Sequence, residues 1–287
     1  MESQIWCAFP GQNTLGEGPI WDPAAKRLYW FDIKQSRLHW GDTTSGETDF
    51  RQLPTRASAA AIRAGGGLLL ATERGLEDFD LSTGELSLRW KLEAARGFRS
   101  NDGKIDVSGR FWWGTMDDHH GERPGVLYRY DPDGSCTQVV DGIHIVNTVS
   151  CSPDGRTYYL ADSRKGVIWA YDMDEAGGLS SRRDFARPDK GAPDGSAVDA
   201  EGYLWNAQWG AWRIVRYAPD GSVDRIVEMP VEQPSSCAFG GPDMTTLYVT
   251  TAREYLSPEA LEAQPLAGSV LAFEAGVKGL ALPAFEG

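Results

Sequence analysis

Six polar residues recur in this chain at one register, each ten or eleven residues before the leucine or aromatic residue that opens a short apolar segment. They comprise two carboxylates, two carboxamides and two hydroxyls: Glu17, Ser58, Asn101, Asn147, Asp194 and Ser236. If the fold brings them together, they form the oxygen-rich kind of site that hard divalent cations prefer. Glu17 and Asp194 would neutralise a 2+ ion and Asn147 would complete a set of three ligands, so that the ion could act as a Lewis acid.

Each of these residues also has an ordinary structural interpretation. Glu17 lies between two glycines and could be a solvated turn carboxylate, and Asn101-Asp102-Gly103 is a typical hairpin-turn sequence. The tripeptide Pro193-Asp194-Gly195 occurs three more times, at positions that are typical of hairpin turns: Asp133, Asp154 and Asp220. Asp194 differs because the segment that follows it itself ends in a turn, at 199–202. We therefore expect Asp194 to open a strand.

Other catalytic patterns are weak. The chain has no GxSxG elbow, HExxH, GxGxxG or P-loop, which disfavours hydrolase triads, zinc proteases and nucleotide folds. The string 117–122 holds two Asp and two His and could bind a metal, although such strings are more often solvated loops. We expect this loop to overhang the mouth of the site. Four tryptophans are expected mainly in the core, although one or two could stack on a sugar ring: Trp113, Trp205, Trp209 and Trp212.

The elements that must position the six polar residues repeat along the chain. The apolar segments begin near residues 28, 68, 111, 158, 203 and 247, and each follows a turn that contains Asp or Gly. A second strand pair completes each unit, which gives four short strands per roughly 45 residues, as in the blade of a β-propeller. We predict an all-β fold, a six-bladed β-propeller of four-stranded blades around a central channel, in one domain spanning 1–287. The alternative is a β-sandwich, which need not repeat.

Two details follow from the propeller prediction. The first strand of each blade lines the channel, so the six polar residues should converge there although they are far apart in sequence. The segment 5–9 should pair with the last blade, which closes the ring and removes an exposed sheet edge. The segment 257–266 is expected to form a short helix.

Composition agrees with many short strands and tight turns. Glycine accounts for 33 of 287 residues, against about 7% in average proteins, and the chain has 11 Trp, 10 Tyr and 10 Phe. The net charge of −13 disfavours nucleic acid and anionic membrane surfaces as partners. No signal peptide and no long apolar span is evident, so a cytoplasmic location is expected. The cysteines lack CxxC spacing and are expected to be free thiols: Cys7, Cys136, Cys151 and Cys237.

Several motifs along the chain resemble those of a known family. They are Leu15-Gly16-Glu17-Gly18-Pro19, Arg99-Ser100-Asn101-Asp102-Gly103-Lys104, Gly114-Thr115-Met116, Asn147 with Ser152-Pro153-Asp154-Gly155, Pro193-Asp194-Gly195 and Cys237-Ala238-Phe239-Gly240-Gly241. Together they resemble the senescence marker protein/regucalcin/gluconolactonase family over nearly the whole chain. The resemblance implies a six-bladed propeller with one catalytic divalent metal that hydrolyses sugar lactones. The segment 252–268 looks like that of bacterial aldonolactonases, including those for pentonolactones.

The resemblance also implies roles for individual residues. Glu17, Asn147 and Asp194 are the expected metal ligands, and Asp194 is also the expected catalytic base. Arg99 and Asn101 are expected to bind the substrate. In two places the chain departs from the family pattern, and both put the substrate preference in doubt. His119 stands where some relatives have a sugar-contacting glutamate, and Thr148 follows Asn147 where many relatives have glycine.

The expected function is therefore that of a metal-dependent lactonase that converts a pentono- or hexonolactone to the aldonic acid. The metal is one divalent ion out of Ca, Zn, Mn, Mg or Fe(II). One alternative is a non-catalytic calcium-binding regulatory propeller, and another is a metal-dependent esterase or organophosphate hydrolase. The expected partner is a small sugar lactone, with no nucleic acid and no membrane, and the chain is expected to be a monomer or a weak oligomer.

Overall fold

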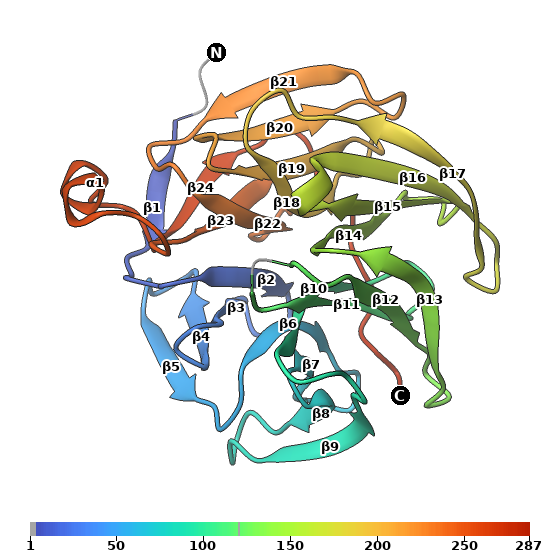
Figure 1. Cartoon of the computed structure of the whole chain (residues 1–287). Coiled ribbons are helices and arrows are strands. Elements are labelled where there is room, and N and C mark those ends of the chain that lie inside the picture. Colours follow the sequence, from blue (N-terminus) through green and yellow to red (C-terminus); the bar gives the residue numbers. More distant parts are fainter. Residues whose placement is uncertain (1–3, 120) are drawn as a thin grey trace.

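Six four-stranded antiparallel sheets surround a common axis as the blades of a ring (Figure 1). The structure, a computed structural model, describes residues 4–119 and 121–287. It confirms the predicted six-bladed β-propeller. The assignment of 1–287 to one domain remains a prediction.

The strands of each blade run outward in chain order. The innermost strands of blades 1 to 6 are β2 (Gly16–Asp22), β6 (Ala57–Ile62), β10 (Phe98–Ile105), β14 (Val146–Cys151), β18 (Ala192–Val198) and β22 (Pro234–Gly240). The second strands are β3 (Arg27–Asp32), β7 (Leu68–Thr72), β11 (Phe111–Asp117), β15 (Thr157–Asp162), β19 (Leu204–Trp209) and β23 (Thr246–Thr251). The third strands are β4 (Arg37–Asp42), β8 (Gly75–Phe79), β12 (Gly125–Tyr130), β16 (Val167–Met173), β20 (Arg213–Tyr217) and β24 (Val270–Glu274).

The outermost strands close the ring. In blades 1 to 5 they are β5 (Thr48–Gln52), β9 (Leu86–Lys91), β13 (Cys136–Ile143), β17 (Leu179–Ala186) and β21 (Val223–Glu228). In blade 6 this place is taken by the N-terminal strand β1 (Trp6–Phe9), which pairs antiparallel with β24. The predicted pairing of segment 5–9 with the last blade is therefore confirmed for these residues.

The core lies between the blades, where the second strands are almost entirely buried. Large aromatic rings fill these layers, as shown by Trp112 of blade 3 and Tyr158 of blade 4, whose ring centroids are 4.4 Å apart. The Pro-Asp-Gly sequences at Asp133, Asp154 and Asp220 all form turns, as predicted. The blades thus form a closely packed frame around the inner strands.

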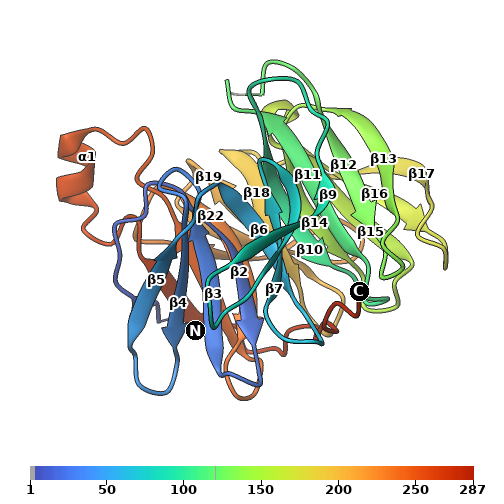
Figure 2. The ribbon, with the colours of Figure 1, turned by 90° about the horizontal axis from the view of Figure 1, so that it is seen from below.

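Among the described residues, two short helices lie outside the blades. The 3-10 helix η1 (Ser163–Lys165) follows β15, and α1 (Pro258–Ala263) lies at the edge of the ring, within the segment predicted to be helical (Figures 1 and 2). In the part of the chain that the structure describes, no helix is long and apolar enough to cross a membrane. All four cysteines are free thiols, as expected.

The C-terminal segment crosses one end of the ring. The amide of Leu280 donates to the carbonyl of Val198 in blade 5, 3.1 Å away, and the amide of Phe285 donates to Ile62 in blade 2, 2.7 Å away. Val198 and Ile62 lie at the ends of their inner strands that are remote from Asp194 and Ser58. The segment therefore connects blades on opposite sides of the ring, at the end away from those polar residues.

Candidate active site in the central channel

Every inner strand carries a register shift next to its polar residue. The shifts fall between Glu17 and Ile20, Ala57 and Ala59, Ser100 and Gly103, Asn147 and Ser150, Pro193 and Ser196, and Pro234 and Ser236. In each case the inner strand has one residue more than its partner, which is a β-bulge, and a bulge re-aims side chains out of the regular alternation. Asn101-Asp102-Gly103 is consequently part of β10 and not the alternative hairpin turn.

The backbone after two of these residues is left-handed. Gly18 has φ +56°, and a Cβ there would lie 2.2 Å from the carbonyl oxygen of Ser58 in the next blade, so the position needs glycine. Thr148 also has a positive φ, of 57°, although it is β-branched and fully buried. Its hydroxyl donates to the carbonyl of Asp194 at 2.7 Å. Blades 4 and 5 are thereby tied together at the site.

Four of the six polar residues at the common register line one cavity of about 230 Å³: Glu17, Asn101, Asn147 and Asp194. Arg99 lines it as well. The structure therefore brings together all three predicted metal ligands and two of the three predicted substrate contacts. The two serines do not line the cavity. Ser58 donates to Ser100 at 2.8 Å, and Ser236 packs against Gly195, so the two serines contact neighbours of the site residues and do not add hydroxyls to the lining.

Glu17 and Asp194 form an electrostatically unfavourable pair in the absence of a cation. Both side chains are buried, with 7% of each residue exposed, and neither forms an ion pair within the described residues. Burial raises the pKa of Glu17, and the charge of Asp102 raises it further. Burial also raises the pKa of Asp194, and the charges of Glu17 and Asp102 add to that effect. Arg99 and Lys104 lower the pKa of Glu17 only in part, and a cation bound beside both carboxylates would favour their ionised forms.

A divalent cation fits this donor set. It would offset the desolvation of both carboxylates and accept the amide oxygen of Asn147 as a neutral ligand, which is the combination that hard cations favour. Within residues 4–119 and 121–287 no three His, Cys, Asp or Glu side chains lie together as a metal site. A cation here would therefore depend on Asn147 as its third protein ligand.

The guanidinium of Arg99 is held at the side of the cavity. Its Nε donates to Asp118 at 2.9 Å, and its Nη1 donates to the Ser100 carbonyl at 2.9 Å and to Asn101 Oδ1 at 2.7 Å. No hydrogen bond from Nη2 occurs among the described residues. Because Arg99 is 4% exposed and lines the cavity, these two N–H groups are available to a bound substrate.

Asp118 is a site residue that the sequence did not single out. Its carboxylate meets cations from three blades, with Lys34 Nζ at 3.3 Å, Arg56 Nη1 at 2.7 Å and Arg99 Nε at 2.9 Å. Burial opposes its ionisation, but the hydrogen bond from Arg56 and the charges of Arg99 and Lys34 outweigh this and hold its pKa well below the usual range. The only sequence signal was its place in the 117–122 string.

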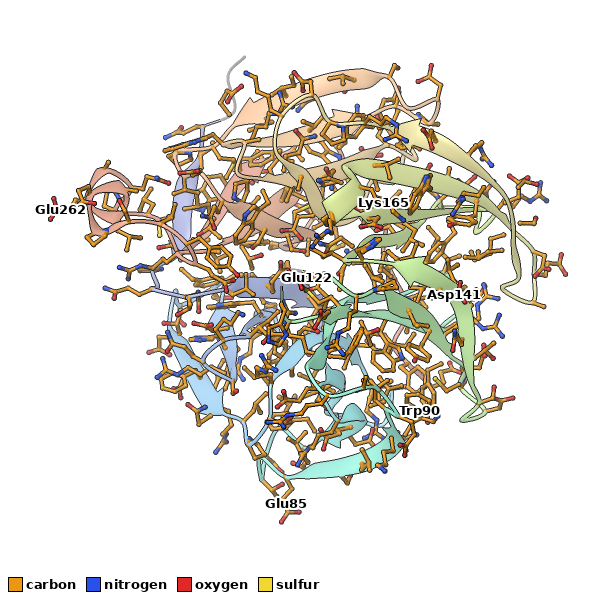
Figure 3. All side chains as sticks on the ribbon, in the orientation of Figure 1. Glu85, Trp90, Glu122, Asp141, Lys165 and Glu262 are labelled. Atoms are coloured by element: carbon orange, nitrogen blue, oxygen red, sulfur yellow. The ribbon has the colours of Figure 1, made fainter. Side chains whose placement is uncertain are left out.

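His119 does not reach the cavity. Its side chain is 75% exposed, and its Nδ1 lies 3.3 Å from Asp117 Oδ1. Asp117 in turn pairs with Arg123 at 2.8 Å, so this carboxylate supports the loop and does not face the site. Figure 3 shows Glu122 of the same loop near the middle of the ring in projection, and Asp118 brings the start of the loop to the cavity. His120 lies outside the described residues. Substrate contact by His119 stays a prediction.

Of the four tryptophans considered for stacking on a sugar ring, most do not line the cavity. Trp113 and Trp205 are fully buried in the core, and Trp212 is 38% exposed and does not line the cavity. Trp209 and Tyr255 do line it. A flat aromatic surface for a sugar ring is thus offered by one of the four tryptophans, from the end of β19.

Comparison with known proteins identifies the family. The family model described as the SMP-30/Gluconolactonase/LRE-like region matches residues 15–253. The chain is 36% identical to a 6-deoxy-6-sulfogluconolactonase of Pseudomonas putida, over 100% of both chains. It is 37% identical to an L-arabinolactonase of Azospirillum brasilense, over 96% of this chain and 93% of the relative.

Among solved structures, the chain is similar to a calcium-binding protein, regucalcin, from Agrobacterium tumefaciens. The TM-score is 0.93 at 34% identity, with 100% of this chain and 98% of the other covered. The similarity in fold, the family match and the two relatives all extend over most of the chain. The chain therefore belongs to the SMP-30/gluconolactonase/LRE-like family, as its motifs predicted.

Proposed function

We propose that this protein is a hydrolase that opens the ring of a sugar lactone, a pentono- or hexonolactone, to give the aldonic acid. The observation that carries the proposal is the single cavity that holds Glu17, Asn147, Asp194 and Arg99. The relatives named as lactonases support the substrate class.

Glu17, Asn147 and Asp194 would hold the divalent ion. When bound, the ion supplies Lewis acidity toward the lactone carbonyl oxygen. Arg99 binds the substrate through its free Nη2 and stabilises negative charge on that oxygen as water adds to the carbonyl carbon. Asn101 lies beside Arg99 and contacts the same part of the substrate.

Asp194 moves the proton. Its carboxylate takes a proton from the attacking water and returns it to the ring oxygen when the bond between that oxygen and the carbonyl carbon breaks. The products balance, because one water and one lactone give one hydroxy acid. Burial of Asp194 favours its protonated form, which suits a group that must accept a proton during the reaction.

The test is hydrolysis of a panel of aldonolactones, followed in a pH-stat with the chain stripped of metal and then reconstituted with single divalent ions. Asp194→Asn should lower the rate by about 10³-fold or more, because it removes both the base and a ligand. Asp220→Asn is the matched control, since Asp220 lies in the same Pro-Asp-Gly tripeptide but in a surface turn. It should leave the rate within about twofold.

The alternatives give different results in the same assay. Equal rates for wild type and Asp194→Asn would overturn the assignment of the base. Binding of calcium without turnover of any lactone would favour the non-catalytic calcium-binding propeller. Hydrolysis of simple esters or organophosphates in place of lactones would favour the esterase alternative.

A further inference from the structure

A directional chain of hydrogen bonds runs along one side of the cavity and fixes which end of each amide faces it. At one end the guanidinium of Arg99 can only donate, so the Asn101 atom that it contacts at 2.7 Å must be the oxygen. The other end of the Asn101 amide is then Nδ2, which donates to the carbonyl of Val146 at 3.0 Å. A backbone carbonyl can only accept, so the orientation of Asn101 is determined from both sides.

The same argument fixes Asn147 through Ser163. The Ser163 hydroxyl lies 2.6 Å from the carbonyl oxygen of Pro193, which can only accept, so its one proton points there. Toward Asn147 the hydroxyl can therefore only accept, and the atom that contacts it at 2.7 Å must be Nδ2. The amide oxygen of Asn147 is thus turned to the opposite side, where Asn101 Nδ2 donates to it at 3.2 Å.

Ser163 is itself firmly placed. It opens η1, and its backbone amide donates to the carbonyl of Ile145 at 3.2 Å. The preceding Asp162 is fully buried and accepts hydrogen bonds from the amides of His144 at 3.1 Å and Ile145 at 3.4 Å. The hydroxyl therefore lies between Asn147 and the residue that precedes Asp194, in contact with two of the three strands that supply the proposed ligands.

We propose that Ser163 is a positioning residue that turns the amide oxygen of Asn147 toward the carboxylates of Glu17 and Asp194, so that the site presents three oxygens to a cation. An amide oxygen has two lone pairs, and Asn101 uses one of them. The second is left for the ion. The inference rests on the proposed function, because it assumes that the site binds a divalent cation.

The consequence of losing Ser163 is specific. Without the acceptor, Asn147 Nδ2 has no partner on that side, and the amide is held only by the 3.2 Å hydrogen bond from Asn101, so its oxygen is no longer firmly directed at the site. Loss of a group that orients a metal ligand typically lowers metal affinity by about 10- to 100-fold. Ser163→Ala should show a loss in this range, and Ser163→Thr, which keeps the hydroxyl, should stay within about threefold of wild type.

The experiment is a titration of the metal-free full chain with Mn²⁺, with free Mn²⁺ measured by electron paramagnetic resonance. Ser152→Ala is the matched control, because Ser152 belongs to the same blade and its hydroxyl donates to Asp154 at 2.6 Å in a turn away from the cavity. It should leave Mn²⁺ affinity within about threefold of wild type. Ser163→Cys, similar in size but a weak acceptor, tests the same point if the alanine variant is unstable.

A double-mutant cycle separates orientation from general damage to the site. In Asn147→Asp both terminal atoms are oxygens, so there is no orientation to lose, and adding Ser163→Ala should change Mn²⁺ affinity by less than about threefold. An equal effect of Ser163→Ala in both backgrounds would overturn the proposal. So would an unchanged affinity in the single variant while wild type binds Mn²⁺. Absence of binding in wild type, to Mn²⁺ or any other divalent ion tried, would instead overturn the metal site itself.

Discussion

Thr148 combines strain and bonding at one residue. It occupies a left-handed conformation, φ 57°, which costs about 1–3 kcal/mol for a residue with a side chain. Its hydroxyl is at the centre of a buried network, since it donates to the Asp194 carbonyl at 2.7 Å and accepts from Ser196 and Asn206, each at 3.2 Å. The bonds hold Asp194 in place, and they offset the strain.

We predict that Thr148→Val destabilises the protein more than Thr148→Gly, by about 1–2 kcal/mol. Valine keeps the strain and loses the hydroxyl, whereas glycine loses the hydroxyl but releases the strain. The measurement is urea unfolding of both variants. Thr250 is the control, because it is equally buried but lies in regular strand β23, and there glycine should be worse than valine. The same order at both positions would show that Thr148 is not strained.

At the scale of residues, the sequence predicted the site residues on the inner strands but not those that follow the second strands. Glu17, Asn101, Asn147 and Asp194 could be predicted because each stands at a fixed distance from a recognisable strand. Asp118 and Ser163 both follow second strands, but one opens an irregular loop and the other a 3-10 helix. Each is the first residue after its strand, but some of their partners lie in other blades, so the position alone did not indicate what they contact.

At the scale of elements, the strands of blade 1 show how side chains pair across a sheet. His39 lies opposite Trp30 on one side and Phe50 on the other. The ring centroids are 5.3 Å apart for Trp30 and His39, with the rings nearly parallel, and 5.5 Å apart for His39 and Phe50. Burial lowers the pKa of His39 to about 4, the charge of Arg37 contributes in the same direction, and Asp32 opposes it. The imidazole is therefore neutral at pH 7 and functions as an aromatic ring.

This arrangement predicts a loss of stability in weak acid. Between pH 6.5 and pH 4 the unfolded chain binds a proton at His39 that the folded chain does not, so the free energy of unfolding falls as the pH falls through this window. Allowing for partial exposure, we expect this to amount to about 1–2 kcal/mol. His39→Phe keeps the stacked ring without the titration.

The measurement is urea unfolding of wild type and His39→Phe at pH 7 and pH 4.5. Wild type should lose more stability than the variant over this range, by roughly the amount given above. Parallel losses in the two proteins would mean that His39 does not titrate differently on folding. The comparison is unaffected by carboxylates elsewhere, because both proteins share them.

The sequence predicted the elements better than their irregularities. The expected starts of the second strands, near 28, 68, 111, 158, 203 and 247, lie within one residue of the observed starts at Arg27, Leu68, Phe111, Thr157, Leu204 and Thr246. The bulges were not predicted, because a bulge has no fixed sequence signature and the Asn-Asp-Gly of β10 is equally typical of a turn. It is the bulges that turn the polar residues into the channel.

At the scale of the whole molecule, the ring is closed twice. β1 completes blade 6, and the C-terminal segment joins blade 5 to blades 2 and 3 across the end of the ring away from the cavity. The first closure could be predicted, because the chain begins with a strand that otherwise lacks a sheet. The second could not, because the segment 276–287 has no periodicity and joins the blades through isolated bridges in place of a regular strand.

Phe285 is the residue through which the second closure should act. It is fully buried, stacks on Tyr130 of blade 3 with centroids 5.6 Å apart, and exchanges backbone hydrogen bonds with blade 2 through Ile62 at 2.7 Å and Ala64 at 2.8 Å. Phe285 therefore contacts blades 2 and 3, and the same segment contacts blade 5 through Leu280. We expect these contacts to stabilise the ring as a unit.

We predict that Phe285→Ala lowers the free energy of unfolding by about 3–5 kcal/mol, as for other fully buried aromatic residues. Leu282→Ala, in the same segment but at a residue that is 37% exposed, should cost less than about 1 kcal/mol. Urea unfolding of both variants provides the comparison, with Mn²⁺ affinity measured beside it. Because the segment lies at the far end of the inner strands, neither variant should change metal affinity while folded. Equal, small effects of the two substitutions would mean that the blades hold the ring without the segment, whereas a loss of metal affinity in folded Phe285→Ala would mean that the two ends of the channel are mechanically connected.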